Sequence, residues 1–566
     1  MEQDFGIEEY VDGQKSPIPC ILKQLYTDFI VQEIGENNEE LPFRPKCPEI
    51  LGQAKEDKID VPAPECLTAD VLAELEKFVS SLGEKSKEVF SINTKGFSKE
   101  ERTAIHKFIR QHFADTLNTE LKGDDIVVTS SSGDRNARKR KRWSPDNPDF
   151  LHFTLAKENK DTAYALGIVA KFIGVKPDLF RTCGIKDKRA VTSQKVSCYR
   201  VEKEKLIKIV PRLRDFTLFD FEYKKEGLKM GGHWGNRFNL ILRNVPTESR
   251  DDMAERCDIF KSKGFINYFG TQRFGSSLNN TAKTGRLIIQ RKWEEAVKNI
   301  MKITAEMGNT TVSEGAAYFL ESGDAQAALK KLKGGQAFAS TESNIFKALA
   351  RGRTWQQCLT EVLPVNIRSL YVHAYQSLIW NKLVTRRIRE FGCEAVTEDV
   401  DKDGNWLTDG NIYSAYLPLP GSDLKLFPEY AKEWLNELLA KDGLTNESFV
   451  ALRDRFSLGD TSRPLLVLPG NVQYDFISYS QPREVLQDGL IDRKEQKKEG
   501  ENGGHLLALK IQFNLPNGAY ATVALRQVTG YDMGRGNMAE AGKVLMAEET
   551  AADELQNDGE VAEPIS

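Results

Sequence analysis

The sequence lacks any apolar run long enough for a membrane helix. Such a helix needs roughly 20 consecutive apolar residues, and the longest runs here, such as the one ending near Ile173, are much shorter. Met1 is followed by acidic residues rather than by the apolar segment of a secretory signal. We therefore expect neither a membrane span nor a secretory signal.

Paired cysteines and the common cofactor motifs are also missing. The eight cysteines stand singly, without the spacing of a disulfide framework or a zinc site, which predicts a reducing compartment. There is no Walker loop, no Gly-x-Gly-x-x-Gly after a strand and no His-Glu-x-x-His helix, and the six histidines are scattered. We expect a protein that works without a metal, a bound nucleotide or a redox cofactor.

The composition is that of a folded chain with several cores. The 566 residues are 40% hydrophobic and 29% charged, which predicts two or three domains. The net charge of −4 would argue weakly against a nucleic-acid partner, because phosphate neutralisation dominates such binding. However, residues 539–566 are rich in Glu and Asp and are typical of a solvated tail. Local basic clusters are therefore more informative than the total charge.

Residues 46–143 have the character of an insertion. The segment begins with a Pro-interrupted, Lys/Glu-rich stretch and ends in a basic run at 130–142. Ser98 is a plausible N-cap for a helix on which Arg102 and His106, four residues apart, share a face. With the strand-like 126–130, this pair resembles a small single-strand nucleic-acid-binding module named for its Arg-x-x-x-His spacing. An ordinary amphipathic helix is the alternative.

The middle of the chain places a charged loop between regular elements. A helix is predicted from the cap at Asp161 or Thr162 to Gly174, then a strand near 179–183, the loop 184–189 and a strand-like stretch at 191–201. Another strand is expected at 238–242, after the glycine-rich 231–235. Helical patterns dominate 265–485, including 293–301 and 372–391, and strand character returns at 507–528, interrupted by Pro516 and Gly518.

The loop at 184–189 carries the strongest local indication of chemistry. Asp187 lies among Lys186, Lys188 and Arg189, close to Gly184, which can adopt conformations barred to other residues. Neighbouring cations favour the ionised carboxylate that covalent catalysis by aspartate requires. The three cations could also receive the phosphates of a bound strand. Taken alone, Asp187 could equally be a turn residue in a solvated charge cluster.

Separated segments, in the right order, resemble the TruD family of pseudouridine synthases and most closely its eukaryotic multisubstrate branch. The matching segments are 28–34, 153–162, 184–194 around Asp187, 235–238, 264–275, 375–377 with 380–381, and 515–516 with 518–522. The resemblance covers most of 20–530. It departs at Ala519, where the family often has Ser, and at Gln527, where a Glu is usual.

The resemblance implies an α+β fold with a discontinuous, antiparallel-sheet pseudouridine synthase catalytic domain. That domain would comprise 1–45, 144–264 and 486–535. A mostly helical TRUD insertion domain would occupy 265–485, and 46–143 would be the Arg-x-x-x-His-like insertion. Residues 536–566 would form a disordered acidic tail.

The resemblance also assigns roles to single residues. Asp187 would be the nucleophile, and no cofactor or metal would be needed. Phe29 would stack on or line the uracil pocket, with Phe238 and Tyr520 nearby, and Asn236 would hydrogen-bond the uracil edge. Lys23 would pair with the carboxylate or with a phosphate. Judged from the residues alone, the three aromatics would more simply be core residues and Asn236 a turn residue.

An RNA substrate follows from the same resemblance. Family members act on tRNA at position thirteen and, in the eukaryotic branch, on other tRNA, small nuclear RNA and messenger RNA sites. The basic run that contains Arg138, Lys139 and Arg140 would be a nuclear-import signal, a phosphate contact or a plain solvated loop. We expect a location in the nucleus, with the cytoplasm as a second site, and no obligate protein partner. The rivals are a non-catalytic RNA-binding protein or tRNA folding chaperone, and a uracil-directed glycosylase or hydrolase.

Overall fold

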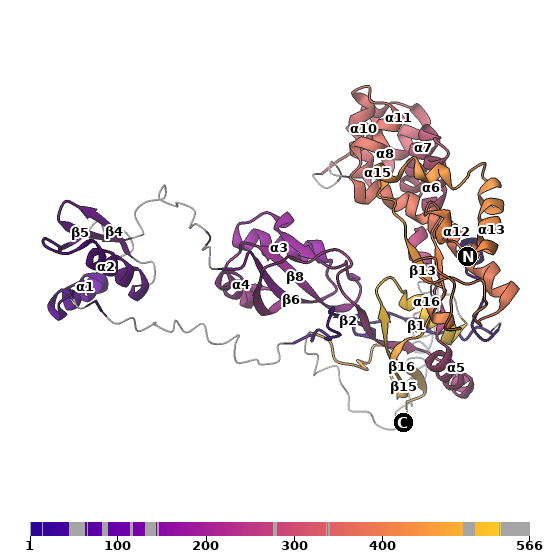
Figure 1. Cartoon of the computed structure of the whole chain (residues 1–566), viewed down its shortest axis with the longest axis horizontal. Coiled ribbons are helices and arrows are strands. Elements are labelled where there is room, and N and C mark those ends of the chain that lie inside the picture. The colour runs from indigo at the N-terminus through magenta and orange to yellow at the C-terminus, as the bar shows by residue number, and fades with distance from the viewer. Residues whose placement is uncertain are drawn as a thin grey trace, which may run out of the picture.

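The structure is a computed structural model. It describes residues 2–13, 15–44, 63–64, 66–81, 89–113, 117–130, 143, 147–275, 280–308, 310–334, 337, 340–490, 504–530 and 533. The described parts comprise a large sheet, a helical region beside it and a small separate unit (Figure 1). None of the helices in these ranges combines the length and apolarity that crossing a bilayer requires.

A nine-stranded sheet forms the centre of the molecule. Its path runs β15 (Gly470–Tyr479), β16 (Leu506–Pro516), β10 (Gly235–Arg243), β2 (Phe29–Ile34), β8 (Val191–Tyr199), β6 (Phe150–Glu158) and β9 (Phe216–Lys224), with β1 (Ile21–Leu22) on β10 and β7 (Phe180–Thr182) on β8. Neighbours pair antiparallel, except that β2 and β8 are parallel. The predicted α+β class with an antiparallel-rich sheet is confirmed.

The pairing of β15 corrects one predicted boundary. We assigned residues up to 485 to the helical insertion, yet β15 pairs with β16 from Gly470↔Asn514 to Tyr479↔Leu506. The chain therefore returns to the sheet about fifteen residues earlier than predicted. The polar residues that alternate along β15 fit an edge strand with one face toward solvent, which a search for helical periodicity does not detect.

Two helices cover one end of the sheet, where the local predictions hold. Asp161 caps α3 (Thr162–Ile173) by accepting from the amides of Ala163 and Tyr164, and Gly174 ends it in the left-handed conformation. α4 (Lys203–Ile209) follows β8. The apolar faces of both helices pack with the inner residues of β6, β8 and β9 in one core. This core holds the strands on either side of the 184–189 loop.

The helical region is built around the long helix α12 (Val365–Phe391). α5 (Arg250–Lys263) leads into this region. Its other helices are α6 (Asn280–Ile289), α7 (Trp293–Glu306), α8 (Thr311–Ser322), α9 (Ala325–Lys331), α10 (Thr341–Ala350), α11 (Trp355–Gln357), α13 (Glu429–Ala440), α14 (Glu447–Val450) and α15 (Arg453–Phe456). Short strand pairs join β11 (Phe265–Ile266) to β14 (Leu466–Val467), and β12 (Tyr416–Pro418) to β13 (Ser462–Pro464).

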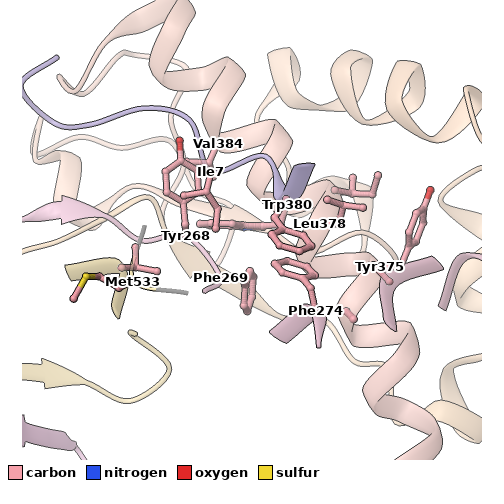
Figure 2. Packing of buried hydrophobic residues seen from close by; sticks show 14 of the residues in the cluster. Ile7, Tyr268, Phe269, Phe274, Tyr375, Leu378, Trp380, Val384 and Met533 are labelled. Carbon is pink, nitrogen blue, oxygen red and sulfur yellow. The ribbon is translucent and has the colours of Figure 1, made fainter. Parts of the chain in front are cut away.

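The sheet and the helical region share one apolar core. Figure 2 shows Trp380 of α12 beside Phe269, whose ring meets the indole edge-on at 5.4 Å. The same cluster continues through Phe238 and Phe513 of the sheet. The segment 267–275, which leads from β11 into the helices, is therefore fixed against both parts of the molecule.

The last regular element differs from the prediction of strand character up to Val528. After β16 the chain turns at 517–520 and forms the helix α16 (Ala521–Thr529). Every residue of this helix is buried, and its polar residues Arg526 and Gln527 bind the N-terminal segment instead of solvent. Its length of nine residues also suits a buried strand, which explains the wrong assignment.

The insertion forms a separate small unit. α1 (Ala69–Ser81) and α2 (Lys99–His112) accompany a three-stranded antiparallel sheet in the order β3 (Val89–Asn93), β5 (Asp125–Ser130), β4 (Leu117–Lys122). Ser98 caps α2 as predicted, in a capping box with Glu101. Leu75, Ile105, Ile109 and Ile126 belong to its own core, and Figure 1 draws the unit apart from the sheet.

Candidate active site

The parallel pairing of β2 and β8 brings two distant segments together. Ile30 of β2 lies opposite Val191 of β8, so the starts of both strands lie at the same edge of the sheet. The segment that precedes β2 contains Lys23, and the loop that precedes β8 contains Asp187. Two residues that are 164 positions apart in sequence thus meet at one place.

A pocket of about 480 Å³ lies against this edge. Side chains at alternate positions of a strand point to the same face, so Phe29 and Val31 of β2 share a face with Asn236 and Phe238 of β10, which pairs with it. The predicted residues that line the pocket are Phe29, Lys186, Asp187, Asn236, Phe238 and Tyr520. The structure therefore gathers them around a single cavity.

Asp187 is the exposed carboxylate of this pocket. Its side chain keeps 44% of its surface accessible, and its Oδ2 accepts a hydrogen bond of 2.6 Å from Nζ of Lys23. The same ammonium group lies 3.7 Å from the centre of the Phe29 ring. Of the two partners predicted for Lys23, the structure shows the carboxylate. Asp187 is held in place but is not enclosed.

Lys186 points the opposite way from the predicted phosphate contact. It is buried, its Nζ lies 2.9 Å from Glu33 and it donates to Oδ1 of Asn236 at 2.7 Å. Glu33 and Asn236 are opposite each other in the β2–β10 pairing, which allows one ammonium group to bind both. Our assignment of Lys186 to the RNA backbone is therefore wrong in this conformation. Its bond leaves the amide N–H groups of Asn236 for a ligand.

A second lysine, Lys157, which we did not predict as a site residue, binds the backbone of the loop. Nζ of Lys157 on β6 donates to the backbone oxygen of Asp187 at 2.8 Å and to that of Lys186 at 3.4 Å. Lys157 is fully buried, and this desolvation lowers its pKa to about 8, against the weaker opposing charges of Asp161 and Asp187. Lys157 and Glu33 both lie in segments that resemble the family, 153–162 and 28–34. That resemblance could have pointed to both residues as part of the site.

The aromatic side chains are less available than predicted. Phe29 is only 3% exposed and one of its faces is covered by Lys23, while Phe238 is 7% exposed and meets Phe29 edge-on. Tyr520 is half-buried and is the most accessible of the three. Phe29 thus forms a wall of the pocket, and Tyr520 offers more ring surface to a base.

The glycine of the loop does not have the expected function. Gly184 does not adopt a positive φ, and a Cβ there would meet only His233 at ordinary contact distance. The position that requires glycine is Gly235, where a Cβ would lie 2.0 Å from the backbone oxygen of Leu515 in the neighbouring strand. β10 and β16 approach each other closely at this position, next to Asn236, and only glycine leaves room for that approach.

The other predicted RNA contacts are spread over the molecule. Lys188 and Arg189 are exposed beside Asp187, and Arg189 also donates to the backbone oxygen of Gln24 at 3.4 Å. In the small unit, Arg102 donates to the oxygen of Thr94 at 3.1 Å and His106 is 2.7 Å from the Thr119 hydroxyl. Arg138, Lys139 and Arg140 lie outside the described residues.

The two departures from the family pattern have different surroundings. Ala519 lines the pocket. Gln527 lies on α16, where its side chain donates to Asp12 at 2.7 Å and accepts from the amide of Val11 at 3.1 Å. Its neighbour Arg526 binds Glu2 at 2.6 Å. Gln527 therefore supports the N-terminal segment and lies outside the pocket wall.

Several further residues complete the pocket. Gln272, His233 and Thr522 line it, and burial with the nearby charge of Lys186 lowers the pKa of His233, so its ring is neutral at pH 7. Across the described ranges, no three His, Cys, Asp or Glu side chains gather as a metal site would require. The arrangement offers one nucleophilic carboxylate, one amide donor and an aromatic wall.

Comparison with known proteins identifies this arrangement. Residues 123–528 match the family model "tRNA pseudouridine synthase D (TruD)". The chain is 46% identical over 550 residues to a Caenorhabditis elegans protein named as a candidate pseudouridine synthase, covering 96% of this chain and 94% of the relative. It is 31% identical to the human "Pseudouridylate synthase 7 homolog", over 94% of this chain and 81% of the relative.

A solved structure agrees at the level of the fold. The crystal structure of a Methanosarcina mazei protein, titled as a TruD, covers 94% of this chain and 98% of its own, with a TM-score of 0.53 and 20% identity. The family match covers most of the chain and includes the 184–189 loop, β10 and the turn before α16, all of which border the pocket. The chain therefore belongs to the TruD family of pseudouridine synthases and is an RNA pseudouridine synthase of its eukaryotic branch.

Proposed function

We propose that Asp187 is the nucleophile of this synthase and acts on a uridine flipped out of structured RNA into the 480 Å³ pocket. The observation that carries the proposal is the position of its carboxylate, 44% exposed at the pocket and held by Lys23. Covalent catalysis needs an ionised carboxylate that the substrate can reach. The hydrogen bond from Lys23 holds the carboxylate at the pocket.

The pocket also suits the bound base. Flipping a uridine costs a few kcal/mol of stacking and pairing, and stacking on an aromatic ring returns roughly 1 to 3 kcal/mol per base. Tyr520 is the ring best placed to contribute, with Phe29 and Phe238 as the apolar wall. The amide N–H groups of Asn236 donate to a uracil carbonyl, since its oxygen already accepts from Lys186.

The reaction is an isomerisation and needs no external reactant. The bond between uracil N1 and ribose C1′ breaks, uracil turns, and a bond from C5 to C1′ replaces it. The proton on C5 leaves and N1 gains a proton, so atoms balance. Asp187 acts either by adding to the uracil ring or by attacking ribose C1′ and forming an ester that the turned base displaces.

Release of tritium tests the role of Asp187. RNA carrying tritium at uridine C5 is incubated with the wild type, with Asp187→Asn and with Asp178→Asn, an exposed carboxylate outside the pocket. We expect release from the wild type and from Asp178→Asn only, with RNA binding kept in all three. Tritium release by Asp187→Asn would refute the proposal.

The products also distinguish the rival activities. Free uracil in the reaction would indicate a glycosylase or hydrolase, in which water takes the place of C5. Tight RNA binding without tritium release by the wild type would indicate a non-catalytic RNA-binding protein or tRNA folding chaperone. Pseudouridine in the digested RNA, at one equivalent per tritium released, is the result that the proposed mechanism requires.

For the substrate we propose tRNA, including position thirteen, together with small nuclear RNA and messenger RNA sites. The support is the family description, which names tRNA, and a relative from Schizosaccharomyces pombe, 27% identical over 93% of this chain, named "Multisubstrate pseudouridine synthase 7". A tRNA transcript in which only the uridine at position thirteen is replaced by cytidine should lose most tritium release. Unchanged release would remove that position from the proposal.

We propose the nucleus as the main location, with the cytoplasm as a second one. The support is the basic run at 138–142, which lies outside the described residues. A fluorescent fusion in which these five residues are replaced by Gly and Ser should leave the nucleus. If it stays nuclear while RNA binding weakens, the run is a phosphate contact instead.

A further inference from the structure

A second pocket of about 640 Å³ adjoins the active site. It lies between α12, the segment 267–273 and the strands β12 and β13, and it shares Asn517 and Ala519 with the uridine pocket. These two residues belong to the turn between β16 and α16. The two pockets are therefore neighbours on either side of this turn.

The walls of this pocket suit a nucleobase. Tyr413 and Tyr416 are half-buried and line it together with Phe269. Aromatic faces of this kind stack with any base. His373 adds a further ring, and its burial, reinforced by the positive Arg273, lowers its pKa, so it is neutral at pH 7. The pocket thus has flat, partly apolar walls.

Two residues of this pocket carry buried polar atoms without hydrogen-bond partners in the part of the chain that the structure describes. Gln376 is 2% exposed, and its amide nitrogen donates to the oxygen of Pro420 at 2.6 Å. Its Oε1 is buried and has no hydrogen-bond partner among the described residues, and the same holds for Nε of Arg273. Both residues line the pocket. A buried polar atom without a partner is costly, so such atoms mark places where a ligand supplies one.

One buried arginine connects the two pockets. Arg463 donates to the oxygen of Gly518 in the shared turn at 2.7 Å and to both oxygens of Asn267 at 2.7 Å. Its guanidinium lies 4.3 Å from the Phe269 ring and 5.7 Å from the Tyr520 ring. These contacts make the wall between the pockets rigid. A ligand in one pocket therefore lies at a fixed position relative to a ligand in the other.

We propose that this second pocket binds the base of a nucleotide adjacent to the target uridine and thereby contributes to the choice of site. Gln376 accepts from an N–H group of that base, Arg273 donates to one of its carbonyl or ring-nitrogen acceptors, and Tyr416 supports it by stacking. The inference rests on the proposed use of the first pocket by uridine. It assigns selectivity to residues of the helical region that make no contact with the target base.

Abasic substitution tests this subsite. Starting from an RNA that the wild type modifies, the base directly 5′ or directly 3′ of the target uridine is removed, and the single-turnover rate of tritium release is measured. Loss of one stacked base should slow the wild type about 10-fold on one side only. Arg273→Met and Tyr416→Leu should each slow the intact RNA by a similar factor. On the RNA that is abasic on that side, neither variant should slow the reaction further.

Controls separate this inference from the function on which it rests. Arg351→Met removes an exposed arginine elsewhere in the helical region and should leave all rates unchanged. Equal slowing of intact and abasic RNA by both subsite variants would overturn the inference, as would full wild-type rates with either neighbouring base removed. Failure of the wild type to release tritium from any RNA would refute the proposed function itself.

Discussion

Two ion pairs formed by residues just before Phe29 in the sequence differ in exposure. Lys23 binds Asp187 at the pocket, with side chains 13% and 44% exposed. Arg243 binds Asp28 with two hydrogen bonds of 2.8 and 2.9 Å, and both side chains are at most 1% exposed. A pair open to solvent contributes little to stability but leaves its carboxylate reachable, whereas a closed pair is inert and costly to break. The first is built for chemistry and the second for fixing the strand that carries Phe29.

The largest effect should come from the open pair. Asp187→Asn should lower the rate of pseudouridine formation by at least about 10³-fold, because an amide is a poor nucleophile. The free energy of unfolding should change by less than about 1 kcal/mol, since the lost pair is half-exposed. Single-turnover rates and urea unfolding of the same preparations measure both. If Asp187→Asn lost stability in proportion to activity, the exposed pair would contribute to folding as well as to chemistry, contrary to this prediction.

The closed pair should respond in the opposite way. Arg243→Met leaves Asp28 buried without its cation, which costs about 3 to 5 kcal/mol of unfolding free energy. The matched control is Arg200→Met, which breaks the exposed pair with Asp149 and should cost at most about 1 kcal/mol. Urea midpoints and slopes give the comparison. Similar losses in the two variants would show that burial does not set the difference.

Features that depend on neighbouring residues could be predicted from the sequence, and features that depend on distant contacts could not. The cap at Asp161, the stop at Gly174 and the strands around the loop were predicted correctly because each depends on a few neighbouring residues. The family match supplied Asp187, Asn236 and the three aromatics, but it did not give their exposure. The inward turn of Lys186 follows from the β2–β10 pairing, which joins residues about 200 positions apart.

Errors occurred where contacts with distant segments decide which side chains meet solvent. The polar side chains of α16 bind the N-terminal segment and the helix was taken for a strand, whereas β15 is an edge strand that joins the sheet by pairing with β16. The second pocket was also invisible, because α12, β12, β13 and the turn at 517–520 come together only in the folded chain. Tertiary contacts, rather than local preference, decide these features.

Within the open pair, the lysine should matter less than the aspartate. Lys23→Met should lower the rate at saturating RNA about 10- to 100-fold, because the carboxylate loses the charge-assisted bond that orients it. Lys188→Met, which removes an exposed lysine next to Asp187, should instead raise KM and weaken the salt dependence of RNA binding. Rates measured over a range of RNA and salt concentrations separate the two. An effect of Lys23→Met on KM alone would assign Lys23 to phosphate.

Lys157 extends the comparison to a buried cation whose bonded partners are backbone oxygens. Its ammonium group lies under the loop that presents Asp187, and desolvation outweighs the attraction of Asp161 and Asp187, so its pKa falls to about 8 from 10.5. Between these values the unfolded chain binds more protons than the folded one. The folded state therefore bears the cost of a buried charge below about pH 8 and gains stability as pH rises toward 10.5.

Replacing Lys157 should remove that gain. In Lys157→Met, the free energy of unfolding should rise less steeply between pH 8 and 10 than in the wild type, by about 1 kcal/mol per pH unit at most. Lys171→Met, on the exposed side of α3, provides the control and should keep the wild-type slope. Urea unfolding at several pH values measures the difference. A parallel pH dependence in all three proteins would mean that Lys157 keeps its proton throughout this range, so that its bonds to the loop oxygens compensate for the loss of water.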